Sequence, residues 1–441
     1  MSNQRDERQH GSKKPSDQRH DYAIDRDRLL YSLAFRRLAQ VTQVVGAAEG
    51  NFFHNRLTHS LKVAQVARRV AEKLIEETGK SRSRSKIGHY LNADVVEAAA
   101  LAHDLGHPPF GHIAEEELNK AALEAQLTDG FEGNAQTFRI LTLLEPNRLN
   151  YPGLNLTRAT LNATLKYPWT KHSDPEHKHS RKFSVYGLDR KSFDFVREEE
   201  EGVQSTIPCL EAKVMEFADD ATYSVHDLED FYLAGLIPLY ILAKSDQEFD
   251  QLIKDWQKKL IDKNDKETAN ALADDETKGR LQRMLQFYVT PSANQLAHVR
   301  GVSSNLIQKF VLSVRVERKE GAFHLNRNKE RDLEMNFLHH LVKKYVIYNP
   351  RLASQQCGQK KIISTLFAIY RDAIKDKNLN IIPTKFLQDG SLEHLSKDVD
   401  AEQQKVRLAV DIVASMSEPE AVTMYRRFTG IEQGSVMDYI T

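Results

Sequence analysis

Apolar residues recur at steps of three and four along several stretches, which is the spacing of one face of an α-helix. Between Thr58 and Glu77 these positions are Leu61, Ala64, Ala67, Val70, Ala71 and Leu74. A second stripe, between Leu210 and Ala234, comprises Val214, Phe217, Ala218, Ala221, Val225 and Leu228. The run VVEAAALA, between Ala93 and Leu105, is made of good helix formers and is followed by Gly106, Pro108 and Pro109, which end helices. The pattern predicts a long helix in each stretch.

Strand-like alternation is scarce, so we predict an all-α fold. The short piece IQKFVLSVRVE (Ile307–Glu317) fits either a strand or a helix packed against the core. Residues 244–278 are highly charged and carry apolar residues at helical spacing, which predicts exposed helices. The residues after about 240 therefore continue the helical pattern as a C-terminal region.

Three segments have too few apolar residues to join a core. Residues 1–21 are rich in Arg, Gln, Ser and Asp, and we expect a tail that is disordered until it docks. The His-rich stretch 171–181 predicts an exposed insertion, and the acidic run 198–201 predicts a solvated face. The remaining chain divides into a main domain over 22–240 and a helical region over 241–441.

Composition narrows the class of protein. Lys plus Arg and Asp plus Glu both number 62 in 441 residues, and this neutral balance argues against a dedicated nucleic-acid binder. Two cysteines, Cys209 and Cys357, give neither a disulfide framework nor a cysteine-rich zinc site, which fits a reducing compartment. The polar N-terminus lacks the apolar core of a signal peptide, and no apolar run reaches membrane-spanning length. We therefore predict a cytoplasmic protein without membrane contact.

Three of the helical segments carry side chains that bind metal ions. His59 opens the first, the doublet His103-Asp104 ends the second, and Asp219 lies on the third. Imidazole nitrogen and carboxylate oxygen together suit Mn, Fe, Co, Ni or Zn and are acceptable for Mg. Taken alone, however, a His-Asp doublet is more often an ordinary helix end.

A zinc-protease interpretation of His103-Asp-Leu-Gly-His107 is rejected. That chemistry needs two histidines one turn apart on a continuing helix, with Glu after the first. Here Asp104 replaces the Glu, and Gly106 with the two prolines interrupts the helix.

Two further groups accompany the metal-type residues. Asp219, Tyr223 and Asp227 are spaced by four residues and line one strip of a helix, although a solvated face would look the same. His112 and Glu115 are three apart at the start of a new helix, where a carboxylate can orient a histidine for acid–base work. The alternative is a pair of structural residues at the turn.

The order and flanking sequence of these residues resemble the HD-domain superfamily and, within it, the dGTPase (deoxyguanosinetriphosphate triphosphohydrolase-like) branch. The pattern H…HD…D is matched by His59, His103-Asp104 and Asp219. The matching segments are YSLAFRRLAQVTQV (31–44), HNRLTHSLKVAQVAR (54–68), AHDLGHPPFGHIAEEEL (102–118), FEGNAQTFRIL (131–141), LKYPW (165–169), ADDATYSVHDLED (218–230) and VDIVASMSEPEAVTMYRRFTG (410–430). The likeness is weakest between residues 244 and 405.

The resemblance implies an HD-domain helical bundle over 22–240, with additional C-terminal helices that complete the pocket and oligomer contacts. It implies one divalent metal ion per site, Mg or Mn by preference, with Ni, Fe, Co or Zn as alternatives. It also implies cleavage of a dNTP, dGTP among them, to deoxynucleoside and tripolyphosphate, and a homo-oligomer, often a hexamer. An allosteric nucleotide or single-stranded DNA is a further possible partner.

Residue roles follow from the same resemblance. The metal ligands are expected to be His59, His103, Asp104 and Asp219, and the catalytic pair His112 and Glu115. The expected substrate contacts are Gln43, Arg56, His107, Asn134, Lys166, Tyr223 and Asp227. The His-rich insertion has no counterpart in this comparison.

Two other interpretations stay open at this point. The chain is compatible with another HD phosphohydrolase, such as a nucleotide phosphatase or phosphodiesterase, because these enzymes share the metal site. It is also compatible with a non-catalytic module that senses nucleotides. The complete set of metal-type residues and His112 favours an enzyme.

Overall fold

The computed structural model describes residues 4–11, 16–43, 54–79, 86–146, 151–173, 181–197, 206–319, 322–347, 350–387 and 401–433. Within these ranges almost all regular structure is helical, and the single sheet has two short antiparallel strands. The prediction of an all-α fold is therefore confirmed. The expectations for 198–201 and for most of the 171–181 insertion concern positions outside the described residues.

The three predicted long helices are present. They are α3 (Arg56–Gly79), α4 (Ala93–Ala102) and α9 (Leu210–Leu233). Asn92 caps α4, because its side chain accepts hydrogen bonds from the backbone N–H groups of Asp94 and Val95. The helix ends at Ala102, so His103 and Asp104 lie in the turn beyond it rather than inside the helix.

The remaining elements follow in chain order. The N-terminal half adds α1 (Asp21–Tyr31), α2 (Leu33–Arg37), α5 (His112–Glu124), α6 (Gly133–Arg139), α7 (Arg158–Ala163) and α8 (Arg190–Arg197). The C-terminal half adds α10 (Leu239–Lys244), α11 (Asp246–Asp262), α12 (Lys266–Ala271), α13 (Asp275–Tyr288), α14 (Gln295–Ser313), β1 (Arg315–Lys319), β2 (Ala322–Asn326), α15 (Lys329–Val342), α16 (Pro350–Lys375), α17 (Ala401–Ala414) and α18 (Glu418–Phe428).

Two of the open expectations are settled by these bounds. Residues 307–317 contain both a helix and a strand, because α14 runs to Ser313 and β1 begins at Arg315. Residues 244–278 contain α11, α12 and the start of α13, whose outer faces are exposed. The prediction of exposed helices there is confirmed.

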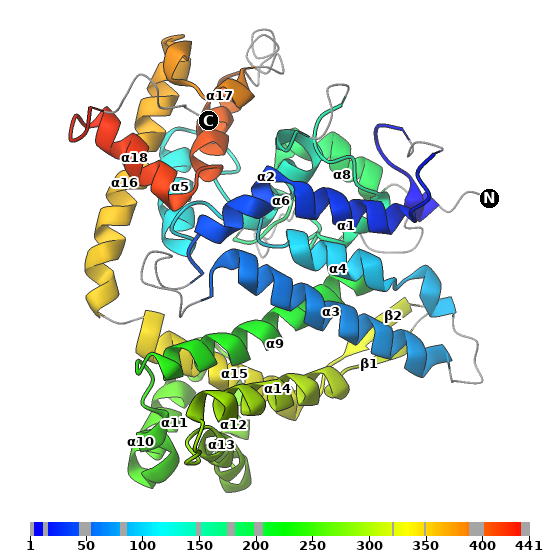
Figure 1. Cartoon of the computed structure of the whole chain (residues 1–441), viewed down its shortest axis with the longest axis vertical. Helices are drawn as coiled ribbons and strands as arrows, with labels where there is room; N and C mark the ends of the chain where they lie inside the picture. The colour runs from blue at the N-terminus through cyan, green and yellow to red at the C-terminus, as the bar shows by residue number, and fades with distance from the viewer. Residues whose placement is uncertain are drawn as a thin grey trace.

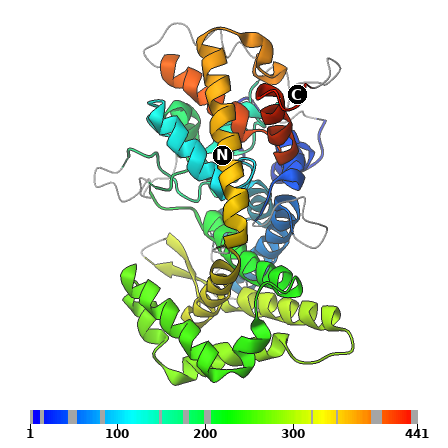
Figure 2. The same cartoon turned by 90° about the vertical axis from the view of Figure 1, so that its left-hand side faces the viewer.

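Two hydrophobic cores organise the molecule. In the larger one, α3 and α9 lie side by side near the centre, with α1 and α4 on one side and α14 and α15 on the other (Figure 1). The second core joins α5 to the C-terminal helices α16, α17 and α18. Figure 2 shows α16, a member of this second core, running along the long axis of the molecule.

The C-terminal helices also hold the segments that carry the predicted chemistry. Glu418, at the start of α18, accepts hydrogen bonds from the backbone N–H groups of Thr42 (2.6 Å) and Phe110 (3.2 Å). Thr42 precedes Gln43, and Phe110 lies in the turn before His112. One carboxylate therefore fixes two loops that are far apart in sequence.

Part of the N-terminal segment is docked on the main core. Arg8 is buried, and its guanidinium donates to Asp25 (2.5 Å) and to the backbone carbonyl of Asn155 (2.7 Å). The second carboxylate oxygen of Asp25 accepts from the Thr157 hydroxyl at 2.6 Å. This buried network fixes residues near Arg8 against α1 and the start of α7.

Gly106 is required by the close packing of the His103–His107 turn on α6. A Cβ atom at this position would lie 2.0 Å from the carbonyl oxygen of Gly133 and 2.4 Å from the backbone nitrogen of Thr137. Gly106→Ala should therefore lower the free energy of unfolding by about 1–3 kcal/mol, the usual effect of overpacking. Denaturant unfolding checks this, with Gly88→Ala as control because a Cβ there meets no atom within 4 Å. Equal stability of the two variants would contradict the packing account.

Candidate functional site

Side chains from three separate segments converge beside the contact between α3 and α9. His59 lies in the first turn of α3, His103 and Asp104 follow α4, and Asp219 lies in the middle of α9. The ligand-type atoms of His59, His103 and Asp104 all lie within 4.8 Å of one another. The Oδ1 atom of Asp219 is 3.2 Å from His59 Nε2 and 3.6 Å from His103 Nε2. We call these four residues the HD cluster.

His103 is oriented so that one ring nitrogen faces the cluster. Its Nδ1 donates to the backbone carbonyl of Ala100 at 2.7 Å, which leaves Nε2 as the nitrogen with a free lone pair. This Nε2 is buried and has no hydrogen-bond partner among the described residues. A buried acceptor without a partner is costly, and a cation at this position would satisfy it.

Asp104 is held by two neighbours outside the cluster. Its Oδ2 accepts a hydrogen bond of 2.6 Å from Nη1 of the fully buried Arg56. Its Oδ1 lies 3.1 Å from Nδ1 of His107 and 3.5 Å from Nε2 of His103. These contacts fix the carboxylate plane, as outer partners of a metal ligand do.

The electrostatics keep both cluster carboxyls ionised. Burial alone would raise the pKa of Asp104 and Asp219, but the positive charge of Arg56 beside Asp104 and that of Lys166 beside Asp219 hold both pKa values below their usual range. Two carboxylates and two imidazoles form a mixed oxygen and nitrogen set, which fits a divalent cation.

A second group, consisting of His107, His112 and Glu115, lies next to the HD cluster. The Nδ1 atom of His112 lies 3.0 Å from Oε2 of Glu115, and the rings of His107 and His112 meet edge to face at 5.2 Å. The His112 side chain is 70% exposed, whereas that of Glu115 is 12% exposed. Burial beside Arg56 lowers the pKa of His107 to about 4, so its ring is neutral at neutral pH.

The turn before His112 takes an unusual backbone path. Phe110 has φ of 68° and Gly111 has φ of 61°, and a Cβ at Gly111 would lie 3.1 Å from Nη2 of Arg56. A larger residue at position 111 would be strained and would press on that guanidinium. The turn therefore brings the start of α5, and with it His112, close to Arg56.

Three other predicted residues lie along α9 or against it. Lys166 Nζ is 3.5 Å from Asp219 Oδ2, and the Tyr223 ring packs on His339 with centroids 4.7 Å apart. Asp227 is buried, and its Oδ2 has no hydrogen-bond partner in the described part of the chain. Burial, with Asp230 and Asp219 nearby, raises its pKa well above the usual range.

Gln43 and Asn134 are not joined to the HD cluster by any hydrogen bond among the described residues. Gln43 is half-buried, and its Oε1 has no partner in these ranges. The Asn134 side chain is turned to Glu132, to which its Nδ2 donates at 2.9 Å.

Sequence reasoning missed several residues that surround these groups. Lys182 contacts Glu115 although 67 residues separate them, and Glu132 caps α6 and contacts Lys182. His339 covers Tyr223, and Glu418 holds the loops described above. Glu132 and Glu418 lie inside segments that resemble the dGTPase branch, but neither was singled out there, and Lys182 and His339 lie outside those segments. Only the tertiary fold shows what these four side chains contact. For Glu418 a sequence signal exists that sequence reasoning missed: the S/T-x-x-E pattern at Ser417–Glu420 is typical of a helix start, and α18 begins there with a capping box.

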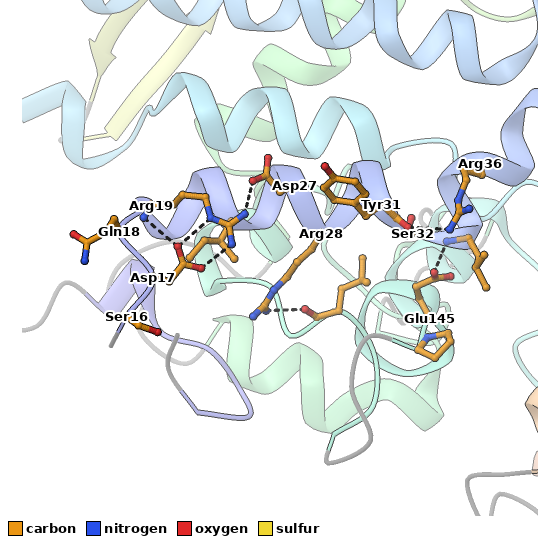
Figure 3. Close-up of a pocket in the computed structure, with 14 residues that line it drawn as sticks. Ser16, Asp17, Gln18, Arg19, Asp27, Arg28, Tyr31, Ser32, Arg36 and Glu145 are labelled. Carbon is orange, nitrogen blue, oxygen red and sulfur yellow. Dashed lines mark hydrogen bonds and ion pairs between the residues drawn. The ribbon is translucent and has the colours of Figure 1, made fainter. Parts of the chain in front are cut away.

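Two cavities lie away from the HD cluster. The larger, of about 1000 Å³, borders α1 and α2, and Figure 3 shows Arg28, Tyr31, Arg36 and Glu145 among its lining residues. Its charges are largely engaged, because Arg19 pairs with Asp17 and Asp27, and Glu145 accepts from the backbone of Leu33. The second, of about 710 Å³, lies between α3, α9 and α14. Size alone therefore does not identify the site where metal-type residues gather.

Comparison with known families agrees with the geometry. The HD domain family matches residues 56–222, which contain all four members of the HD cluster. The phosphohydrolase-associated domain family matches residues 326–427, from the end of β2 through most of α18. The fold and the site thus define a phosphohydrolase of the HD class, whose members bind divalent metals. Among the described residues, no helix is both long and apolar enough to cross a membrane.

Relatives along the whole chain define the family. A deoxyguanosinetriphosphate triphosphohydrolase-like protein of Corynebacterium efficiens is 34% identical over 94% of this chain and 92% of its own length. A protein of the same description from Streptomyces coelicolor is 34% identical over 92% of each chain. A relative from Vibrio cholerae is 41% identical over about half of each chain, 50% and 49%. The chain belongs to the deoxyguanosinetriphosphate triphosphohydrolase-like family.

Proposed function

We propose that this phosphohydrolase cleaves dNTPs, dGTP among them, to deoxynucleoside and tripolyphosphate. The observation that carries the proposal is the meeting of the HD cluster with the His112–Glu115 pair, joined through His107. Such a site combines a place for a cation with a proton-transfer group. The reaction breaks the bond between the α-phosphorus and the 5′ oxygen, with water supplying a hydroxyl to phosphorus and a proton to the nucleoside.

In this proposal His59, His103, Asp104 and Asp219 hold one divalent ion, with Mg or Mn preferred and Ni, Fe, Co or Zn as alternatives. When bound, such an ion supplies positive charge and Lewis acidity to the phosphate group. Arg56 and Ala100 orient two of the four ligands through the hydrogen bonds described above.

Arg56, Lys166 and His107 are proposed to receive the triphosphate. The chain as a whole is neutral, so a polyanionic substrate needs a local concentration of donors. Arg56 suits this role because its planar guanidinium can donate two parallel hydrogen bonds. Lys166 adds a second cation: its Nζ faces Oδ2 of Asp219, whereas Oδ1 of Asp219 faces His59 and His103.

His112 is proposed to transfer a proton at the reacting oxygens. Because its Nδ1 is engaged by Glu115, the Nε2 atom is left to exchange a proton with the substrate or water. The largely exposed ring of His112 is open to an incoming ligand, whereas the buried Glu115 fixes its orientation.

Gln43, Tyr223 and Asp227 are proposed to contact the deoxyribose. Two of them, Gln43 and Asp227, carry a buried oxygen without a hydrogen-bond partner among the described residues, and a sugar hydroxyl would satisfy either one. Tyr223 would crowd a 2′ hydroxyl and so favour deoxyribose. Asn134 is assigned to the substrate only by the resemblance. A homo-oligomer, often a hexamer in relatives of this kind, and a cytoplasmic location remain predictions.

Arg56→Lys should lower kcat/KM by roughly 10- to 100-fold. A point charge replaces a fork that already donates to Asp104, and losing a charge-assisted hydrogen bond costs about 1.5–3 kcal/mol. Steady-state kinetics with dGTP check this. Arg69→Lys is a matched control, because Arg69 is exposed on the same helix. Unchanged kinetics in Arg56→Lys would leave Arg56 with a structural role only.

Product analysis tests the proposed function. Each of the four dNTPs, singly and mixed, is incubated with Mg or Mn, and the products are separated by chromatography. We expect deoxynucleoside and tripolyphosphate in equal amounts. Release of orthophosphate or pyrophosphate alone would instead identify another HD phosphohydrolase. Binding without turnover under all conditions would identify a sensing module.

A further inference from the structure

Lys182 lies between two buried carboxylates that come from different segments. Its Nζ is 3.3 Å from Oε1 of Glu115 and 3.1 Å from Oε1 of Glu132. The Lys182 side chain is 48% exposed, whereas those of Glu115 and Glu132 are 12% and 2% exposed. The ammonium group therefore covers the solvent side of a carboxylate pair that would otherwise repel.

Glu132 provides a fixed anchor for this bridge. One of its oxygens accepts from the backbone N–H groups of Asn134 (2.6 Å) and Ala135 (3.1 Å) at the start of α6. The other accepts from the Asn134 side chain and from Lys182. Because Glu132 is held by backbone, it places the Lys182 ammonium at a defined position beside Glu115.

Glu115 uses its two oxygens for different partners. Oε2 faces Nδ1 of His112 at 3.0 Å, and Oε1 faces Lys182, with the Gly133 N–H at 3.4 Å as a weaker donor. Lys182 therefore occupies one oxygen and leaves the other for the histidine. Without the ammonium, the carboxylate would lose the charge-assisted hydrogen bond that holds it in this orientation.

The charges around Glu115 also favour the ionised form of its carboxylate. Burial alone would raise its pKa, but the hydrogen bond from His112 and the charge of Lys182 hold the pKa below its usual range. Glu132, whose own pKa is raised by burial, is the second carboxylate that the Lys182 ammonium contacts. Lys182 is the only ammonium or guanidinium that contacts either carboxylate among the described residues.

We propose that Lys182 is a positioning residue for proton transfer: it keeps Glu115 ionised and oriented towards His112. The inference rests on the role assigned to His112 in the proposed function, and it adds a residue outside the motifs that support that function. Lys182 acts through Glu115 and does not contact the substrate.

The test compares Lys182→Gln, Lys182→Arg and the control Lys171→Gln. Lys171 comes from the same region, but among the described residues its ammonium donates hydrogen bonds only to the backbone carbonyls of Thr128 and Asp129, at 3.3 and 3.4 Å. For Lys182→Gln we expect kcat with dGTP to fall roughly 10-fold, the loss that matches one charge-assisted hydrogen bond, with KM unchanged. Lys182→Arg should recover most of this activity, and Lys171→Gln should match the unmodified chain.

The acidic side of the pH profile gives a second readout. Removing the ammonium raises the pKa of Glu115, so the carboxylate is lost at a higher pH as the solution is acidified. The acidic limb of kcat should therefore move to higher pH in Lys182→Gln and stay in place in Lys171→Gln. A rise in KM alone would make Lys182 a substrate contact and would overturn the proposal, as would unchanged kcat.

A measurement without turnover separates this inference from the proposed function. The Glu115 carboxyl carbon, assigned with Glu115→Gln, is titrated by ¹³C NMR in the full chain and in Lys182→Gln. We expect a higher midpoint in the variant, and an unchanged midpoint would refute the role of Lys182. If the chain releases no tripolyphosphate, the proposed function fails, while this titration still decides whether Lys182 controls Glu115.

Discussion

Asp104→Ala is expected to remove the bound metal and to lower turnover by roughly 10³-fold or more, because a metal contributes several kcal/mol of charge stabilisation. The Asp104 carboxylate joins the cluster to its surroundings, since it lies near His103 within the cluster and contacts His107 and Arg56 outside it. Metal content measured by mass spectrometry, together with kcat for dGTP, checks both effects. The two losses should occur together.

Two further variants make this result interpretable. Asp104→Ala also leaves the buried Arg56 without its partner, so Asp104→Asn, which retains a side-chain oxygen for Arg56, separates metal loss from a folding defect. Asp94→Asn serves as control, because Asp94 lies on α4, the helix that precedes Asp104, but pairs with Arg68 near the surface. Retained activity and metal in purified, folded Asp104→Ala would remove Asp104 from the ligand set.

His112→Ala is expected to lower kcat roughly 10²–10⁴-fold while substrate binding persists, which is the usual range for an acid–base group. The histidine is exposed and its only side-chain hydrogen bond among the described residues is to Glu115, so its removal leaves no buried group unsatisfied except that carboxylate, which keeps Lys182. The folded state should therefore survive. The affinity for dGTP, measured under conditions without turnover, and steady-state kinetics together check the prediction.

His172→Ala is the matched control for this experiment. His172 is also an exposed histidine near a carboxylate, Asp129, but it belongs to the edge of the His-rich insertion. It should retain full activity. If His112→Ala instead changes only KM, the histidine binds substrate and another group must move the proton.

The helical part of the fold was predictable because its signal is local. The stripes in 58–77 and 210–234 repeat with the period of a helix and correspond to α3 and α9. The strand β1 was harder, because its five residues directly follow α14 and have no alternating apolar pattern of their own. Its pairing with β2 is nonetheless local in sequence, because β2 begins three residues after β1 ends.

The candidate site was predictable where it is made of motifs. The doublet His103-Asp104 and the helix around Asp219 identified two segments with metal-type side chains. The fold brings these side chains together with His59. Lys182 and His339 could not be found in the same way, because Lys and His are common surface residues and neither lies beside a motif. Their importance depends on which carboxylate or ring they meet in three dimensions.

Anomalous diffraction from crystals grown with Mn²⁺ tests the central claim most directly. We predict one strong peak per chain, with ligand atoms from His59, His103, Asp104 and Asp219 all bonded to the same ion. A peak that lies elsewhere, or an ion that leaves any two of these side chains uncoordinated, would contradict the account.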